Sequence, residues 1–208
     1  MKKIKKVCPN DFEHEYWQQD QLVLGIDEAG RGPLAGPLCV AGVVFPQGYE
    51  NPEIYDSKAI SEKKRNELYD RIMDDALWFE ILLVSPEEID RLNIYRADQE
   101  AFARIADDSG APVILTDAMP IPEKERVVVP LVKGDQKSIS IAAGSILAKV
   151  TRDRLMVEYD RQYPEYGFAK HKGYPTRQHM QAIEEYGITP IHRRSFGPVA
   201  AQQLKLDL

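Results

Sequence analysis

Two adjacent carboxylates, Asp27 and Glu28, stand at the end of a short apolar run and directly before a turn rich in glycine and proline. Asp117 closes a second apolar run, and Asp135 follows a third. Acids at the ends of neighbouring strands converge in space, and clustered carboxylates cannot all stay ionised unless a cation joins them. Ligands that are all oxygen select Mg²⁺ or Mn²⁺ over zinc. The four acids therefore predict a hard-metal site.

Each acid taken alone has a simpler interpretation, as a helix cap or a solvated loop residue. Asp27 and Glu28 also pose a geometric difficulty, because neighbouring residues on a strand point to opposite faces. The two can share a site only where the strand ends or is bulged. The Gly-rich turn that follows Glu28 predicts such an end.

The strands that would position these acids are predicted from short apolar runs bounded by Gly, Pro or polar residues, which are typical of buried strands. The runs cover residues 22–26, 38–45, 78–84, 112–116 and 126–132. The first, fourth and fifth runs lead to the acids named above.

Helices are predicted where a capping residue precedes a run of helix formers, as at Ser61 and at the Ser85-Pro86 pair. The expected helices cover residues 61–75, 85–107 with a break before Tyr95, 138–159 and 176–186. Strands that alternate with helices indicate an α/β domain, here followed by a helical C-terminal extension.

Charge is unevenly distributed along the chain. The net charge is −6, but residues 131–200 hold eleven Lys and Arg against seven Asp and Glu, a local balance of +4. A basic segment beside an acidic remainder is compatible with a phosphate-tracking face next to a carboxylate metal site. Solvated helix faces would give the same balance.

The composition argues against several classes of protein. Cys8 and Cys39 are far apart and form no C-x-x-C, so neither a disulfide framework nor a zinc site is expected. The basic start MKKIKKV leads into polar residues and not into the apolar stretch of a signal peptide. No run has the apolar length of a membrane span. We therefore expect a cytoplasmic protein.

Five sequence blocks occur together in an order that resembles type 2 ribonuclease H. They are GIDEAGRGPLAGPLCVAGVV at 25–44, DSK at 56–58, KGDQKSISIAAGSILAKVTRD at 133–153, YGFAKHKGYPT at 166–176 and HRRSF at 192–196. DEAGRG alone would be suggestive, and the five blocks together are spread over residues 25–196, nearly the whole length of the chain.

The resemblance implies an RNase H-like fold, which is an α/β fold with a mixed central β-sheet flanked by helices and a helical C-terminal extension. Residues 1–160 are expected to form the catalytic domain, in which residues 1–18 are a loosely ordered lead-in. Residues 161–208 are expected to form the substrate-binding extension and tail. A monomer is expected.

The resemblance also implies a reaction. The expected activity is hydrolysis of the RNA strand in RNA–DNA hybrids and nicking of DNA duplexes on the 5′ side of a single embedded ribonucleotide, which leaves 3′-hydroxyl and 5′-phosphate ends. Such an enzyme serves ribonucleotide removal and genome maintenance. Two Mg²⁺ or Mn²⁺ ions about 3.5–4 Å apart can activate the attacking water and stabilise the departing 3′-oxygen, so that no protein nucleophile is needed.

Asp27, Glu28, Asp117 and Asp135 match the four metal-binding acids of the family. The chain departs from the family at Asp117, because Ala118 stands where glycine is common. The turn after this acid is therefore expected to differ.

Selection of RNA over DNA requires contact with the 2′-hydroxyl group. Gly30-Arg31-Gly32 offers backbone groups that can approach a sugar closely, since two of its residues lack Cβ. Tyr174 resembles the family's junction-sensing tyrosine, which stacks on the deoxyribose beyond the ribonucleotide; without the resemblance it would be an ordinary turn residue. Tyr174→Phe or Tyr174→Ala is expected to erode activity on a lone ribonucleotide.

Basic and polar side chains in the matching blocks are candidates for phosphate contacts. The basic candidates are Lys58, Lys170, Lys172, Arg193 and Arg194. Ser138, near Asp135, is expected either to hold a phosphate or to cap the long helix. For His171 and His179 we expect phosphate contact or packing and not catalysis.

The last six residues, QLKLDL, resemble the short peptide with which bacterial proteins bind the sliding clamp. In such peptides a glutamine and spaced leucines enter a hydrophobic pocket. The residues concerned are Gln203, Leu204, Leu206 and Leu208. An ordinary amphipathic chain end is the alternative.

Two other function classes remain open at this point. A catalytically idle binder of RNA–DNA hybrids would keep the basic face but could dispense with the acids. A small-molecule phosphoryl-transfer enzyme would need a phosphate-binding loop, and GRGPLAG is not followed by the required G-K-[ST]. The four acids and the glycine pattern favour the nuclease.

Overall fold

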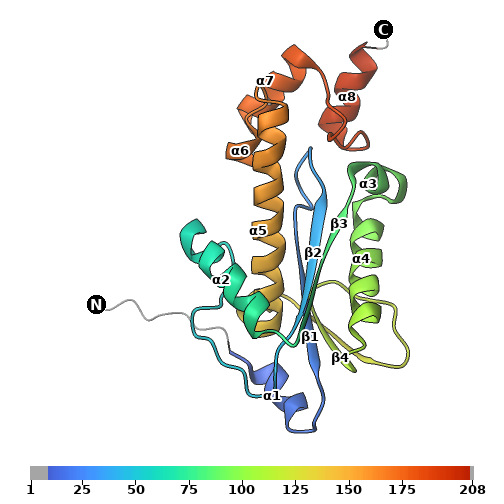
Figure 1. Ribbon diagram of the computed structural model, residues 1–208. Coiled ribbons are helices and arrows are strands. Elements are labelled where there is room, and N and C mark those ends of the chain that lie inside the picture. The colour runs from blue at the N-terminus through green and yellow to red at the C-terminus, as the bar shows by residue number, and fades with distance from the viewer. Residues whose placement is uncertain (1–8, 207–208) are drawn as a thin grey trace. The chain divides into compact units, whose positions relative to one another are not determined.

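The computed structural model describes the backbone of residues 9–206 and the side chains of residues 9–202. A five-stranded sheet with the order β3-β2-β1-β4-β5 forms its centre (Figure 1). The strands are β1 (Val23–Ala29), β2 (Leu38–Val44), β3 (Trp78–Val84), β4 (Val113–Asp117) and β5 (Val127–Leu131). All five apolar runs are therefore strands, as predicted.

The sheet is mixed. β1 pairs in parallel with β4, and β4 pairs in parallel with β5. The turn at residues 30–37 joins the neighbouring strands β1 and β2. A connection this short cannot form the crossover that parallel strands need, so β1 and β2 run antiparallel. The parallel pairs bring the carboxyl ends of β1 and β4 to the same edge of the sheet.

The predicted helices are all present, and each begins close to its predicted cap. The helices are α1 (Asp11–Trp17), α2 (Glu62–Asp75), α3 (Pro86–Leu92), α4 (Ile94–Ser109), α5 (Ile139–Gln162), α6 (Phe168–His171), α7 (Arg177–Tyr186) and α8 (Gly197–Leu206). Ser61 and Ser85 accept hydrogen bonds from the third residue after them, as N-caps do. None of the helices in the described part of the chain could span a membrane.

Helix α1 corrects one expectation. Residues 11–17 were expected to belong to a loosely ordered lead-in, but they form a helix whose Glu13 and Trp17 are buried. The Trp17 ring belongs to a core cluster with apolar residues of β1 and β4, Val23 and Val113 among them. Burial of an aromatic ring stabilises this short helix, which contains too few residues to be stable by its own propensity.

Helices cover both faces of the sheet (Figure 1). On one face α5 lies directly against the strands: a Cβ at Gly25 of β1 would collide with the backbone of Ser140, and a Cβ at Gly144 would lie 2.7 Å from the Ala41 carbonyl oxygen. On the other face, a Cβ at Gly42 would collide with Ile105 of α4. The absence of side chains at Gly25 and Gly144 is what allows α5 to pack this close.

The chain divides into two compact units that are interleaved in sequence. Unit 1 consists of the chain up to Ala29 together with Val40–Leu82 and Gln99–Val150, and unit 2 of Gly30–Cys39, Leu83–Asp98 and the chain from Thr151 on. The predicted boundary between residues 160 and 161 is therefore not a boundary between these units. The first half of α5 belongs to unit 1 and the second half to unit 2.

Candidate metal centre and substrate-binding residues

Asp27 lies near the end of β1 in a buried, polar surrounding. Its side chain is 4% exposed, and its Oδ1 atom accepts a hydrogen bond from the Glu28 N–H at 2.7 Å. The Ser145 hydroxyl of α5 is also hydrogen-bonded to this carboxylate and lies 2.9 Å from the hydroxyl of Ser57. Burial, the nearby Glu28 carboxylate and that of Asp117 all raise the pKa of Asp27. A carboxylate in such a place needs a cation to stay ionised.

Asp117 is the last residue of β4, beside Asp27 at the same edge of the sheet. The register pairs Ile26 with Thr116, so the residues that follow each of them are neighbours. The Asp117 carboxylate accepts a hydrogen bond from the Gly134 N–H at 2.8 Å. Ala118 then turns with φ +55°, in the left-handed region that favours glycine. The turn after this acid is thus tight although its residue is alanine.

Asp135 belongs to a single 3₁₀ turn, Gly134–Gln136, that follows β5. Its side chain is buried. Burial and the carboxylates of Asp56 and Asp117 raise its pKa to about 6. The structure therefore places Asp27, with Glu28 and Asp117 beside it, and Asp135 in one region of unit 1, and metal binding by these acids stays a prediction.

Asp56 is a fifth carboxylate in this region, and the sequence reasoning did not select it as a site residue. It accepts hydrogen bonds from Gln136 Nε2 at 3.2 Å and from the Lys58 N–H at 2.9 Å. Its membership of the matching DSK block was a signal that could have found it. A short turn, and not a strand end, delivers this acid, so the strand-end argument missed it.

Lys58 is a cation whose pKa these carboxylates influence. Partial burial lowers its pKa, but the surrounding carboxylates outweigh this effect and the pKa is raised. The carboxylates are those of Asp27, Asp135, Asp56 and Asp117. The Lys58 side chain is exposed, so it can still reach a ligand.

The chemistry of these donors fits hard divalent ions, since all of them are oxygens. Within the described residues, no three His, Cys, Asp or Glu side chains lie close enough together to hold a metal ion between them. Mg²⁺ commonly takes only one or two carboxylates and completes its shell with water and substrate phosphate oxygens. Pairs of these acids fit that kind of binding, which needs no complete protein cage.

In unit 2, the turn at Gly30-Arg31-Gly32 is held by a buried arginine. Arg193 donates hydrogen bonds to the carbonyls of Gly36 at 2.9 Å, Arg31 at 3.0 Å and Gly30 at 2.6 Å. Its side chain is 0% exposed. The expected phosphate contact does not fit this placement, because the guanidinium is enclosed and donates to backbone oxygens instead.

Arg152 of α5 supports the same turn from another side, and sequence reasoning did not select it. It donates to the carbonyls of Ala35 at 3.0 Å, Pro37 at 2.9 Å and Lys172 at 2.9 Å. It thereby connects the turn to the segment around Tyr174. Five donors on a rigid fork suit arginine to this role, which lysine could not fill.

Tyr174 is exposed, and its ring lies beside the glycine turn. Its side chain is 44% exposed. A Cβ placed on Gly32 would lie 3.5 Å from Tyr174 Cε1, which is ordinary van der Waals contact. Arg31 forms an ion pair with the fully buried Asp98 at 3.0 Å. An exposed aromatic ring and an open glycine backbone thus lie next to each other.

The remaining predicted contacts differ in their exposure. Lys170 and Arg194 are exposed, whereas the Lys172 ammonium donates to the Ala169 carbonyl. Ser138 is fully buried: it donates to Glu13 and accepts from the Ile141 N–H at 3.1 Å. Of its two expected roles, the cap of α5 is therefore the one that the geometry fits.

His171 and His179 are both buried, so packing is the role that fits them. The four clamp-binding positions lie outside the residues whose side chains are described. These positions are Gln203, Leu204, Leu206 and Leu208.

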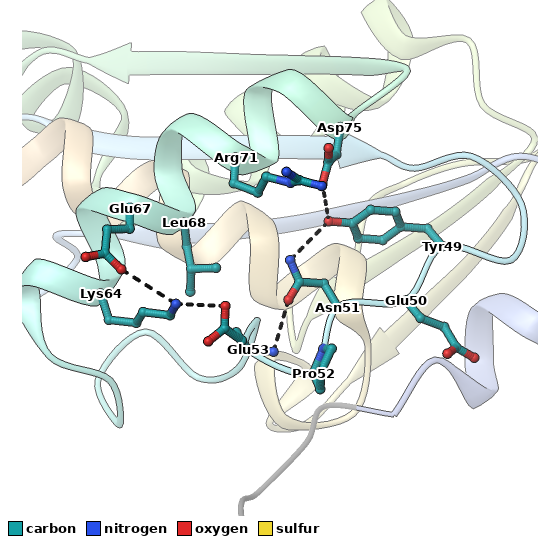
Figure 2. A pocket seen from close by; sticks show the side chains of 10 residues that line it. All are labelled: Tyr49, Glu50, Asn51, Pro52, Glu53, Lys64, Glu67, Leu68, Arg71 and Asp75. Carbon is teal, nitrogen blue, oxygen red and sulfur yellow. Dashed lines mark hydrogen bonds and ion pairs between the residues drawn. The ribbon is translucent and has the colours of Figure 1, made fainter.

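A separate hollow in unit 1 is lined by charged residues of α2 and of the loop before it (Figure 2). Its charges are largely paired with one another: Lys64 lies 2.7 Å from Glu53, and Arg71 lies 2.7 Å from Asp75. None of the predicted site residues lines it. It does not compete with the acid cluster as a metal site.

Comparison with known proteins gives a consistent result. A family model described as Ribonuclease HII matches residues 24–199. A ribonuclease HII of Clostridioides difficile is 52% identical over 190 residues, which are 90% of this chain and 74% of the relative. One of Francisella tularensis is 47% identical over 180 residues, 86% of this chain and 96% of the relative.

Solved structures agree with the sequence comparisons. The ribonuclease H2 of Pyrococcus horikoshii is similar with a TM-score of 0.78 and 27% identity, over 89% of this chain and 99% of that one. The ribonuclease HII in a PCNA complex from Archaeoglobus fulgidus has a TM-score of 0.72 and 28% identity, over 84% of this chain and 95% of that one. The expected fold is thereby confirmed.

Proposed function

Since this chain belongs to the ribonuclease HII family of metal-dependent endonucleases, we propose that it nicks DNA duplexes on the 5′ side of a single embedded ribonucleotide. Family membership gives the coarser activity, cleavage of the RNA strand in RNA–DNA hybrids. The proposed nick leaves a 3′-hydroxyl and a 5′-phosphate. The observation that supports it most is the buried Asp27, which lies among carboxylates and beside an exposed lysine.

We assign the binding of divalent ions to Asp27, Glu28, Asp117 and Asp135. When bound, two such ions activate the attacking water and stabilise the departing 3′-oxygen. The protein keeps Asp27 in place through the Glu28 N–H and the Ser145 hydroxyl. The Gly134 N–H orients Asp117 in the same way. Lys58 offers an exposed ammonium that attracts the substrate phosphate toward these acids.

We assign recognition of the ribonucleotide to unit 2. The open backbone at Gly30-Arg31-Gly32 suits an approach to the 2′-hydroxyl, and the exposed Tyr174 ring offers a surface on which a sugar can stack. Lys170, Lys172 and Arg194 remain candidates for phosphate contacts. Arg193 and Arg152 act indirectly in this scheme, because they fix the turn that carries the glycines.

A clamp partner is a separate proposal. The sequence QLKLDL at residues 203–208 resembles a clamp-binding peptide, and the similar Archaeoglobus fulgidus protein was solved as a complex with PCNA. We propose that the tail binds a sliding clamp. Full-length protein should retain purified bacterial clamp in a pull-down, and a chain that ends at residue 202 should not. Equal retention by both chains would reject the tail as the contact.

The reaction itself is tested with a labelled DNA duplex that contains one ribonucleotide. Wild-type protein with Mg²⁺ or Mn²⁺ should nick on the 5′ side of the ribonucleotide, and EDTA or Asp27→Asn should abolish the nick. Asp108→Asn is the matched control, because Asp108 pairs with Arg104 on α4 and lies outside the acid cluster. This variant should nick at the wild-type rate.

The alternative function gives a different outcome of the same experiment. A hybrid binder without catalysis would hold the duplex in a mobility-shift assay and produce no nick with either metal. That result would leave the fold intact and reject the proposed reaction.

A further inference from the structure

Two buried histidines of unit 2, His192 and His179, are linked to Tyr174 by hydrogen bonds, and a third, His171, packs beside them. His192 Nδ1 lies 2.9 Å from the Thr189 backbone nitrogen, and His192 Nε2 lies 3.0 Å from His179 Nε2. His179 Nδ1 in turn lies 3.0 Å from the Tyr174 carbonyl oxygen. The His171 ring stacks on His179, with their centroids 4.7 Å apart. The line of contacts ends at the backbone of the exposed tyrosine.

The hydrogen atoms along this line can be placed in only one order. The Thr189 N–H can only donate, so His192 Nδ1 accepts and the proton of His192 is on Nε2. His192 Nε2–H therefore donates to His179 Nε2, and His179 carries its proton on Nδ1. His179 Nδ1–H then donates to the Tyr174 carbonyl, which can only accept. This order requires both imidazole rings to be neutral, because each accepts a hydrogen bond through one of its ring nitrogens.

The surroundings favour neutral rings. His179 is 0% exposed and His192 1% exposed. Burial lowers the pKa of His179 to about 4 and that of His192 to about 3. At neutral pH both imidazoles are uncharged, and the order of donors and acceptors is maintained.

The backbone of Tyr174 is fixed on both of its sides. Its N–H donates to the His171 carbonyl at 2.9 Å, and its carbonyl also accepts from the Thr176 N–H at 2.8 Å. The preceding residue, Gly173, accepts from the Leu34 N–H at 2.8 Å, which joins this segment to the glycine turn. The His179 side chain thus adds a hydrogen bond to the Tyr174 backbone, while the Tyr174 ring stays exposed.

We propose that His179 and His192 are positioning residues, whose hydrogen bonds fix the Tyr174 backbone and so hold its ring beside Gly32 for recognition of the ribonucleotide. This inference rests on the proposed role of Tyr174. Neither histidine contacts the substrate in this scheme. The alternative is that the imidazoles only fill the core beside Tyr166 and Phe168, whose stacked rings both His179 and His192 contact.

Two substitutions at His179 separate these interpretations. Asn has its amide at the place of Nδ1, so His179→Asn can still donate to the Tyr174 carbonyl. Gln extends its amide to the place of Nε2, so His179→Gln can still bind His192 but not the Tyr174 carbonyl. If His179 served only in packing, there would be no reason for Asn to preserve the preference for a single ribonucleotide better than the longer Gln.

The readout is the ratio of kcat/KM for nicking at a single ribonucleotide to kcat/KM for cleavage of a continuous hybrid. For His179→Asn we expect this ratio to stay within about 3-fold of wild type, and for His179→Gln to fall about 10-fold or more. In a Tyr174→Ala background, His179→Gln should cause no further fall, because the residue through which it acts is gone. Circular dichroism and thermal unfolding check the fold of each variant.

Each outcome decides a different point. If Tyr174→Ala leaves the ratio unchanged, the proposed role of Tyr174 fails. If Tyr174→Ala lowers the ratio but the Asn and Gln variants behave alike, the positioning role of His179 is rejected. Should His179→Gln not fold, His192→Asn replaces it, since Asn can bind Thr189 but cannot reach His179. An unchanged ratio in that variant would likewise overturn the proposal.

Discussion

At the scale of single residues, Gly30 and Gly32 of the same turn have different roles, one in folding and one in keeping a surface accessible. Gly30 has φ +101°, and a Cβ there would collide with the Arg152 guanidinium, which three carbonyls hold in place. Gly32 has no such strain, and a Cβ there would meet only the Tyr174 ring at 3.5 Å. The first glycine is needed for folding, whereas the second keeps a surface open.

We therefore expect alanine substitutions at these two glycines to affect different properties, stability at Gly30 and activity at Gly32. Gly30→Ala should lower the free energy of unfolding by about 1–3 kcal/mol, since it combines backbone strain with a clash. Gly32→Ala should change it by less than about 0.5 kcal/mol but reduce nicking about 10-fold or more, because the methyl group occupies the space that a sugar needs. Urea unfolding and nicking assays on both variants measure this. Equal losses of stability would contradict it.

At the scale of elements, helix α1 is attached to the start of α5 by one buried carboxylate. Glu13 Oε1 accepts from the Ser138 hydroxyl and from the Ser140 N–H at 3.0 Å. Among the described residues, Glu13 Oε2 has no hydrogen-bond partner. Burial raises the pKa of Glu13. We therefore expect the hydrogen-bond acceptor at Glu13 Oε1 to contribute more to stability than the negative charge of the Glu13 carboxylate.

A pair of substitutions separates acceptor from charge. Glu13→Gln keeps the oxygen acceptor and should change the free energy of unfolding by less than about 0.5 kcal/mol. Glu13→Ala leaves two donors at the start of α5 without their acceptor and should cost about 1–3 kcal/mol. Urea unfolding measures both. If the two variants were equally destabilised, the carboxylate charge would be the important property.

The elements were predictable from sequence to different degrees. Strands and capped helices carry local signals, so the five apolar runs and the Ser61 and Ser85 caps were located correctly. The strand ends also brought Asp27, Asp117 and Asp135 together. Helix α1 was missed because its stability comes from burial of Trp17 and Glu13, and tertiary burial has no local signal. Arg193 was assigned to phosphate because sequence gives charge but not burial.

At the scale of the whole molecule, the chain passes several times between its two units. Unit 2 includes Gly30–Cys39 and Leu83–Asp98 in addition to the C-terminal part. Its core cluster accordingly joins Leu34 and Ala35 to Met156, Phe168 and other C-terminal residues. A boundary placed by position along the sequence could not find this arrangement, because contacts between distant segments define it.

The stability of the molecule should depend on pH through His179 and His192, the two buried histidines that form the hydrogen-bonded line to Tyr174. Histidine in the unfolded chain titrates near pH ~6.5, whereas the pKa of His179 is lowered to about 4 and that of His192 to about 3. Below pH ~6.5 the unfolded chain binds protons that the folded chain does not. Stability is therefore fully present above that pH and falls as the pH is lowered, by up to about 1.4 kcal/mol per pH unit for each histidine.

Other groups titrate in the same range, so the measurement compares two proteins. The pKa of Asp135 is raised to about 6, and this group acts in the opposite direction. Urea unfolding of wild type and of His179→Asn between pH ~7.5 and pH ~4.5 should show a weaker loss of stability in the variant. Parallel pH curves for the two proteins would mean that His179 does not contribute.

The close approach of α5 to the sheet has a consequence for how this sequence can vary over evolutionary time. Backbone meets backbone at Gly25 and Gly144, so no side chain acts there as a spacer whose replacement would shift the helix. Exchanges among the surrounding Val, Ile and Leu residues can then accumulate without moving Asp27 away from Ser145. Substitutions elsewhere in the core should therefore leave the acid site in place. Gly25 and Gly144 themselves cannot be replaced in this way, because any side chain there would push α5 away from the sheet.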